Sequence, residues 1–242
     1  MSGGAMDSNV KGSLALGALV AIGLTILGYL LGSSAIRFKE YERVVSVKGL
    51  SEKEIPADVA VWPIQFTGAN ADLTALYSKL EADTRQILAF LESKGFDKAE
   101  ITVAAPTIMD KLAQPYGNNE QVQLRYTASQ AITVYSGKID LVRSSQNDLA
   151  ELGKKGIAFG GADYQHTEFL FTKLNDVKPA MIEEATRKAR EVAEKFAADS
   201  NSRLGKIKSA NQGQFTVSNR DSNTAHIKNV RVVSTVEYYL SD

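Results

Sequence analysis

The chain of 242 residues contains no cysteine, only two histidines and no excess of either charge, with 28 basic and 28 acidic residues. The absence of cysteine excludes disulfides, thiolate metal sites and cysteine nucleophiles. The balanced charge argues against a nucleic-acid partner, because binding to phosphates normally requires a basic excess. Neither His166 nor His226 has a second ligand at metal-binding spacing. We therefore predict no metal, no cofactor and no catalytic residue.

What the sequence does contain is one long apolar segment near its amino terminus. The run Leu14–Ile36 carries no charged residue. As a helix it would extend roughly 35 Å, which is enough to cross a hydrocarbon core of about 30 Å. We therefore expect a short tail over residues 1–13, a single transmembrane anchor over 14–36, and a body over 37–242. The bilayer is then one partner of the chain.

Small residues recur along one side of this segment. They are Gly17, Ala21, Thr25, Gly28 and Gly32. At about 100° per residue they fall within an arc of roughly 80°. A face of small residues lets membrane helices approach closely, so these five residues predict helix–helix association. The alternative is a single anchor surrounded by lipid, in which the glycines have no partner.

Two further interpretations of this segment remain open. Lys11 and the small residues at 33–35 could belong to a cleavable signal peptide, although its apolar region would normally be only about 7–15 residues long. Arg37, Lys39 and Arg43 follow the segment. By the positive-inside rule these basic residues favour a cytoplasmic body.

The body alternates between strand-like and helix-like patterns. Two helices are strongly indicated over 72–94 and 176–200, and a third over 138–152. Strands are expected over 43–50, 59–66, 101–109, 122–135, 164–172, 206–215 and 230–240, with a polar loop over 216–229. Pro63 lacks an amide donor and predicts an edge or bulged strand. The 14-residue pattern over 122–135 is long enough to extend past its own domain.

Apolar spacing identifies the inward faces of the two long helices. They are Leu73, Leu76, Leu80, Ile87 and Leu91 in the first, and Met181, Ala185, Ala189, Val192 and Phe196 in the second. The order strand, long helix, strand, strand occurs over about 57–136 and again over about 163–240. These patterns predict an α+β body of two such units with mixed or antiparallel sheet.

A ligand pocket is the main alternative to a purely structural body. The glycine-rich segment 153–161 lacks the order of a phosphate-binding loop, so we interpret it as a connection. Together with Trp62, Tyr116, Phe159 and Tyr164 it could instead line a binding pocket. Packing in the core is the competing interpretation for these aromatic residues.

Three stretches, taken in order, resemble the SIMPL-domain family, the YggE-like proteins of the bacterial cell envelope. Residues 45–49 with 55–60 are similar to its opening hairpin, and residues 126–134 to its central strand. The alanine-rich segment 185–197 running into Leu204-Gly205-Lys206-Ile207 is the most specific match. The resemblance covers about residues 43–240.

The resemblance implies an α+β fold, an exported or anchored body, large ring-like homo-oligomers and a link to envelope and oxidative stress. It supplies no catalytic residues. We therefore expect a non-enzymatic, single-pass protein of the bacterial inner membrane, with its body in the periplasm despite the charge rule. A monomeric or dimeric periplasmic ligand-binding module is the alternative.

Overall fold

The computed structural model describes residues 5–40, 43–113, 123–160 and 166–241. Its first element is the 36-residue helix α1 (Ala5–Glu40). Within it, Gly12–Ser34 has a mean hydropathy of 2.3 and is long and apolar enough to cross a membrane. This segment coincides closely with the predicted anchor over 14–36. The sequence pattern thus located the helix correctly.

The chain divides into two compact units, and neither is continuous in sequence. Unit 1 comprises residues 1–51, 179–215 and 232–242, and unit 2 comprises residues 52–178 and 216–231. Helices and antiparallel sheets occur together, so the predicted α+β class is confirmed. The strands β1 (Val44–Pro56) and β10 (Ile227–Ser241) each contribute residues to both units.

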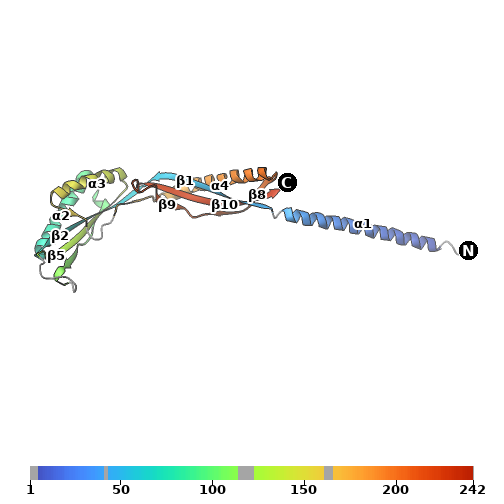
Figure 1. Ribbon diagram of the computed structural model, residues 1–242, viewed down its shortest axis with the longest axis horizontal. Coiled ribbons are helices and arrows are strands. Elements are labelled where there is room, and N and C mark those ends of the chain that lie inside the picture. The colour runs from blue at the N-terminus through green and yellow to red at the C-terminus, as the bar shows by residue number, and fades with distance from the viewer. Residues whose placement is uncertain (1–4, 41–42, 114–122, 161–165, 242) are drawn as a thin grey trace. The chain divides into compact units, whose positions relative to one another are not determined.

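Unit 1 is built on a sheet whose strands lie in the order β1, β10, β8, with β8 spanning Arg203–Gln212. Helix α4 (Leu174–Asp199) lies along this sheet (Figure 1). Its buried residues recur at every fourth position, and they are Met181, Ala185, Ala189, Ala193 and Ala197. Of these, Ala189 and Ala193 pack with Val47, Val236 and Tyr238 of the sheet. The core of unit 1 is therefore thin and rich in alanine.

The close approach of α4 to β1 depends on Gly49. A Cβ atom added there would lie 1.8 Å from the carbonyl oxygen of Ala185 and 2.6 Å from the amide nitrogen of Ala189. Only small side chains fit between the helix and the sheet at this distance. The prediction that Val192 and Phe196 face inward is therefore wrong, since both are exposed.

Unit 2 is built on a six-stranded sheet. Its strands are β2 (Val59–Asn70), β3 (Ile101–Val103), β4 (Thr107–Asp110), β5 (Tyr126–Ser136), β6 (Ala158–Phe159) and β7 (Glu168–Leu170). The path is β3-β5-β2-β6, with β4 beside β5 and β7 beside β2. The short 3₁₀ helices η1 (Lys98–Glu100) and η2 (Lys111–Ala113) precede β3 and follow β4.

Helices α2 (Leu73–Lys94) and α3 (Ile139–Lys154) cover one face of this sheet (Figure 1). Alternate residues of β2 and β5 point toward them, and the core contains Trp62, Phe66, Leu80, Ile87, Ile132 and Val142. The Asp72 side chain accepts a hydrogen bond from the Ala75 amide at the start of α2. Gly95 ends this helix with a φ of 99°. The predicted inward face of α2 is correct except for Leu73, which is exposed.

Pro63 lies in a central strand, so the predicted edge strand is wrong. β2 pairs with β5 on one side along its whole length, with Pro63 opposite Thr133. On its other side β2 pairs with β7 at residues 59–61 and with β6 at residues 66–67. Pro63 falls between these two short ladders, where a missing amide costs no strand hydrogen bond.

Two other strands differ from expectation. The long pattern over 122–135 forms β5 from Tyr126, and β5 pairs with β2 from end to end, so it does not extend beyond its own sheet. Val122 lies outside the described residues. The segment expected to be polar loop contains the strand β9 (Thr216–Asn219), which pairs with residues 228–231 of β10.

Candidate functional site

The sheet of unit 1 has two outer edges, formed by β1 and β8. Among the described residues, β1 and β8 each pair only with β10. Every residue of β8 except Leu204 is exposed. Unpaired amides and carbonyls along such edges are templates for an additional strand. The two edges are candidates for contact with another chain.

The edge along β1 is bordered by one stripe of α4. The stripe consists of Glu184, Lys188, Val192 and Phe196, at four-residue spacing. The Ser51 hydroxyl of β1 donates to Glu184 Oε2 at 2.9 Å, and Lys188 Nζ lies 2.7 Å from Glu184 Oε1. These contacts place the stripe on the β1 side of the helix. The sequence pattern detected its apolar members but could not show that they remain exposed.

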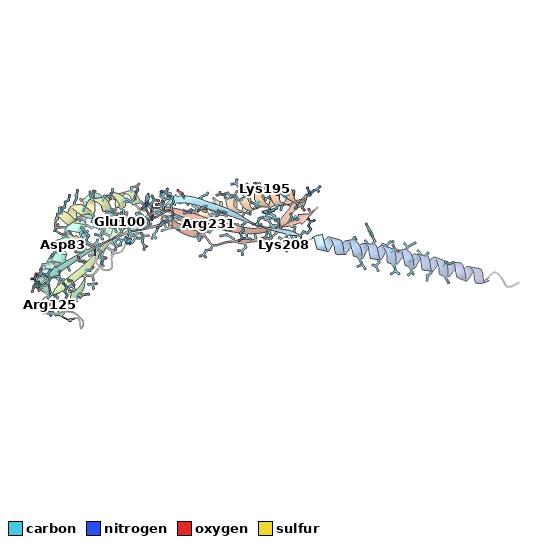
Figure 2. The ribbon with its side chains drawn as sticks, in the orientation of Figure 1. Asp83, Glu100, Arg125, Lys195, Lys208 and Arg231 are labelled. Carbon is cyan, nitrogen blue, oxygen red and sulfur yellow. The ribbon has the colours of Figure 1, made fainter. Side chains whose placement is uncertain are left out.

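The edge along β8 carries lysines and irregular pairing. Lys206 and Lys208 are exposed, and the register with β10 shifts on both sides of Tyr238. Lys208 Nζ lies 5.9 Å from the ring centre of Tyr239, on the sheet face opposite α4 (Figure 2). Charged residues and bulges of this kind oppose pairing of an edge with a copy of itself. The two edges of unit 1 thus differ in chemistry.

The five residues predicted to associate in the membrane all lie on α1. A Cβ atom added at Gly17, Gly28 or Gly32 would meet nothing within 4 Å, so each is open to a neighbour. The Thr25 hydroxyl donates to the Ala21 carbonyl oxygen at 2.7 Å within the helix. The predicted seam stays a prediction, because a single chain supplies no opposing helix.

Unit 2 contains a groove of about 690 Å³ that is open to solvent. Its lining combines small apolar residues with polar ones, including Gln65, Thr67, Ser129, Ala105 and Ala158, and it also contains the charged residue Lys79. Gln65 Nε2 donates to Ser129 Oγ at 3.0 Å, so part of this polar lining is already paired. The groove can accommodate a ligand, but it is not the enclosed apolar cavity of a typical small-molecule site.

Neither Trp62 nor Phe159, the two described aromatic residues predicted for a pocket, lines this groove. Trp62 is buried in the core, with its ring centre 6.4 Å from that of Phe96. Phe159 is half-buried and packs against the same core. Tyr116 and Tyr164 lie outside the described residues. Among the described residues of the glycine-rich segment, Gly156 and Ala158 line the groove.

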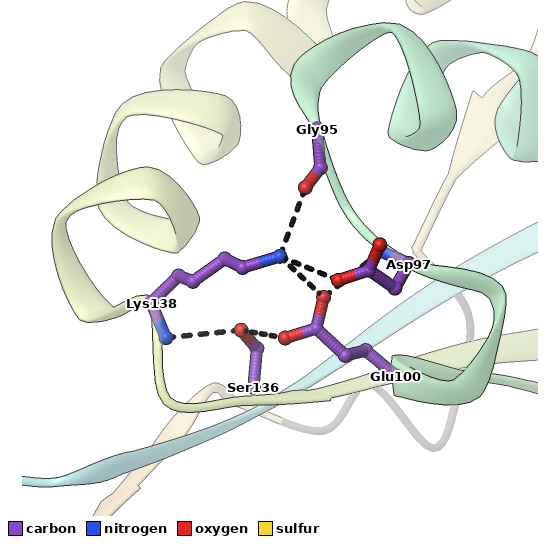
Figure 3. Close-up of polar contacts among 5 residues, drawn as sticks. All are labelled: Gly95, Asp97, Glu100, Ser136 and Lys138. Atoms are coloured by element: carbon purple, nitrogen blue, oxygen red, sulfur yellow. Dashed lines mark hydrogen bonds and ion pairs between the residues drawn. The ribbon is translucent and has the colours of Figure 1, made fainter.

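A charged cluster of unit 2 centres on Lys138 (Figure 3). Its Nζ atom donates to the Gly95 carbonyl at 3.0 Å and to Asp97 Oδ2 and Glu100 Oε2 at 2.9 Å each. Ser136 Oγ donates to Glu100 Oε1 at 2.7 Å and accepts from the Lys138 amide at 3.0 Å. The cluster joins the end of α2, η1, the end of β5 and the start of α3.

Electrostatics in this cluster stabilise the charged forms. Hydrogen bonds to Asp97 and Glu100 raise the pKa of Lys138. Burial alone would raise the pKa of Glu100, but hydrogen bonds from the Asp97 amide, Ser136 and Lys138 together lower it. A carboxylate held in its ionised form by three donors is a poor proton donor or acceptor at neutral pH. The cluster is therefore a structural clamp.

The two histidines have separate surroundings. Burial lowers the pKa of His226, and the nearby Arg143 guanidinium lowers it further. The His226 ring packs edge-on against Phe169 at 6.0 Å, and its carbonyl accepts from the Ala57 amide at 2.8 Å. His166 lines a shallow groove beside Glu168. No group of three metal-binding side chains occurs among the residues that the structure describes.

Comparison with models of protein families gives a match over most of the chain. The family described as "SIMPL: Protein of unknown function (DUF541)" matches residues 45–237. No curated protein matches the chain. The matched range begins in β1 and ends in β10, so it contains the body and leaves out α1.

Proposed function

Because the chain belongs to the SIMPL family, whose function is unknown, we propose that it is a membrane-anchored, non-enzymatic protein of the bacterial envelope that assembles into a ring-like homo-oligomer. Its role is to act as a scaffold or to protect the envelope under stress, oxidative stress included. The proposal assigns no chemistry to the chain. The charged cluster around Lys138 connects elements of unit 2.

The observation that carries the proposal is the pair of outer edges on one sheet, which have no further partner strand in the part of the chain that the structure describes. β1 and β8 lie on opposite sides of β10. A surface that contacts a different surface on the next copy generates a head-to-tail series, which closes into a ring when the rotation between copies permits it. A single free edge would instead favour a closed dimer. Two different edges favour an assembly with more members.

The apolar helix supports anchoring to the bilayer. Gly12–Ser34 has the length and composition of a single span. We place the body in the periplasm and the anchor in the inner membrane, in keeping with the resemblance to envelope proteins. A reporter fused after Asp242 tests this orientation. Activity of the reporter only in the cytoplasm would show that Arg37, Lys39 and Arg43 set the orientation instead.

The central experiment is a mass measurement of the full-length protein in mild detergent. We expect a discrete assembly much larger than the 26.2 kDa chain at micromolar concentration. A strictly monomeric protein would overturn the proposal. Measurement with and without a reducing agent serves as no more than a handling control, because the chain has no cysteine.

The open groove of unit 2 favours a second candidate, a monomeric or dimeric periplasmic ligand-binding module. Its volume of about 690 Å³ is within the range of small-molecule sites. Thermal unfolding in the presence of a panel of small neutral polar compounds tests this candidate. A ligand that stabilises a monomer, with no larger assembly present, would favour it over the homo-oligomer.

A further inference from the structure

The outer edge of β1 has an apolar border that the single chain leaves exposed. Val192 is 37% exposed and Phe196 is 56% exposed, and both belong to the stripe of α4 beside β1. Next to them, the outward amides and carbonyls of β1 have no partner strand among the described residues. A strand added at this edge would gain hydrogen bonds from β1 and apolar contact from α4.

The outer edge of β8 carries a matching apolar residue. Ile207 is 50% exposed and lies opposite Tyr238. Tyr238 is buried and belongs to the cluster that packs with α4. Ile207 therefore points to the same face of the sheet as the helix. Leu204, opposite Leu240, lies on this face as well.

Strand direction determines how the two edges can meet. β8 runs antiparallel to β10. The Leu240 amide donates to the Arg43 carbonyl at 2.9 Å, and the chain then continues along β1 away from that end of β10. β1 and β8 consequently run in the same direction. Suppose that two copies stand side by side and are related by rotation, without inversion of either. Then β8 of one copy meets β1 of the other as a parallel strand, and α4 lies on the same face of both sheets.

We propose that β8 of one copy adds in parallel to the outer edge of β1 in the next copy, and that Val192 and Phe196 close over Ile207 of the added strand. This inference rests on the proposed function and specifies its interface. In such an arrangement all amino termini leave the assembly at the same end. Every anchor can then enter the same bilayer. An antiparallel β1–β1 contact would reverse alternate copies and leave Ile207 exposed.

The register of the joint can be estimated from β10. Ser209 lies opposite Glu237 on one side. Counting along β1 from the Leu240–Arg43 hydrogen bond places Ser46 opposite Glu237 on the other side. When neighbouring copies are related by a rotation about an axis parallel to the strands, each residue keeps its height along that axis. Ser46 of one copy should then meet Ser209 of the next, and both are exposed.

Cysteine cross-linking tests this joint directly, because the chain has no cysteine of its own. The full-length variant Ser46→Cys with Ser209→Cys is oxidised in mild detergent, beside each single variant. We expect the double variant to form a ladder beyond the dimer and the single variants to remain uncross-linked. A dimer from Ser46→Cys alone would overturn the proposal in favour of a β1–β1 contact.

Mass measurement on the same samples separates the two proposals. An intact large assembly that fails to cross-link through this pair would overturn the joint and leave the homo-oligomer standing. A monomer would overturn both. The protein is also diluted a hundredfold before oxidation. Cross-linked products that still form at this dilution would exclude random collision.

A surface variant tests the apolar border independently. Phe196→Ser should weaken assembly roughly tenfold or more, since it removes a large side chain that becomes buried only in the joint. Tyr135→Ser is the matched control, because Tyr135 is 54% exposed in unit 2. Both variants should retain the circular dichroism of the parent. Equal assembly of the two variants would show that α4 takes no part in the joint.

Discussion

Gly49 of β1 lies against the backbone of Ala185 in α4, so close that a Cβ atom at Gly49 would be 1.8 Å from the Ala185 carbonyl oxygen. The row of buried alanines in α4 results from the same close approach of helix and strand. Helix and strand approach each other at a separation that larger side chains would prevent. This contact determines both the core of unit 1 and the exposure of the neighbouring Val192 and Phe196.

Gly49→Ala should destabilise the protein by about 1–3 kcal/mol, because α4 must move away from β1 to admit the methyl group. Urea unfolding measures the change. Gly153→Ala is the control, since Gly153 lies in α3 and a Cβ atom there meets nothing within 4 Å. The control should be unchanged or more stable by about 0.5–1 kcal/mol. Equal stability of Gly49→Ala and the parent would contradict the close contact.

Ser136→Ala should lower the free energy of unfolding by about 1–3 kcal/mol. The Ser136 hydroxyl is buried, and it bonds both Glu100 and the Lys138 amide. Its loss leaves Glu100 Oε1 without that donor. Ser144→Ala in α3 is the control, because the Ser144 hydroxyl is exposed and donates to the Leu141 carbonyl of its own helix. A similar cost for both variants would argue against the clamp.

Stability should fall as the pH is lowered from about 7 to 5.5, and His226 should account for part of the fall. Its pKa is lowered in the folded chain, chiefly by burial, whereas the unfolded chain titrates near pH 6.5. In this range the unfolded state binds more protons, so stability rises with pH. The pKa values of Asp58, Glu100, Asp110 and Asp221 are lowered, so their contributions are lost only at more acidic pH.

Urea unfolding of His226→Gln at pH 7 and 5.5 provides the measurement. The variant should lose less stability between the two values than the parent does. An identical pH dependence in the variant and the parent would assign the effect to other groups.

Gly28→Leu should weaken association of the isolated anchor fused to a neutral reporter, whereas Ile26→Leu should not. Gly28 belongs to the predicted seam with Gly17, Ala21, Thr25 and Gly32, and bulk there would separate two helices that pack closely. The isolated anchor is needed because the body can assemble by itself. Association of both variants to the same extent would show that α1 anchors the chain without helix–helix contact through this face.

The sequence predicted the elements of the body better than their surroundings. Helix periodicity located α2, α3 and α4, and alternation located β5 and β10, because these patterns record which side of an element is apolar. The pattern could not show that the space beneath α4 admits only alanine, which depends on Gly49 from a distant part of the chain. Val192 and Phe196 were therefore placed inside wrongly.

Pairing between distant strands explains the other differences. Pro63 indicated an edge, but β2 is central, and the proline falls between the ladders of β6 and β7. The polar residues of β9 show no apolar alternation, and only its partner β10 makes the segment a strand. The edges of unit 1 could not be predicted at all, since an edge is defined by the strand order of the finished sheet.

The order of synthesis gives the strand arrangement of unit 1 a consequence for how the protein matures. β10 lies between β1 and β8, yet it is made after both of them. Until β10 is available, β1 and β8 have no common neighbour. The sheet of unit 1 can therefore form only after β10 has been made and, for a periplasmic body, carried across the membrane. If export paused before β10 was translocated, β1 and α4 would lack the central strand of their sheet and their apolar residues would remain exposed to solvent.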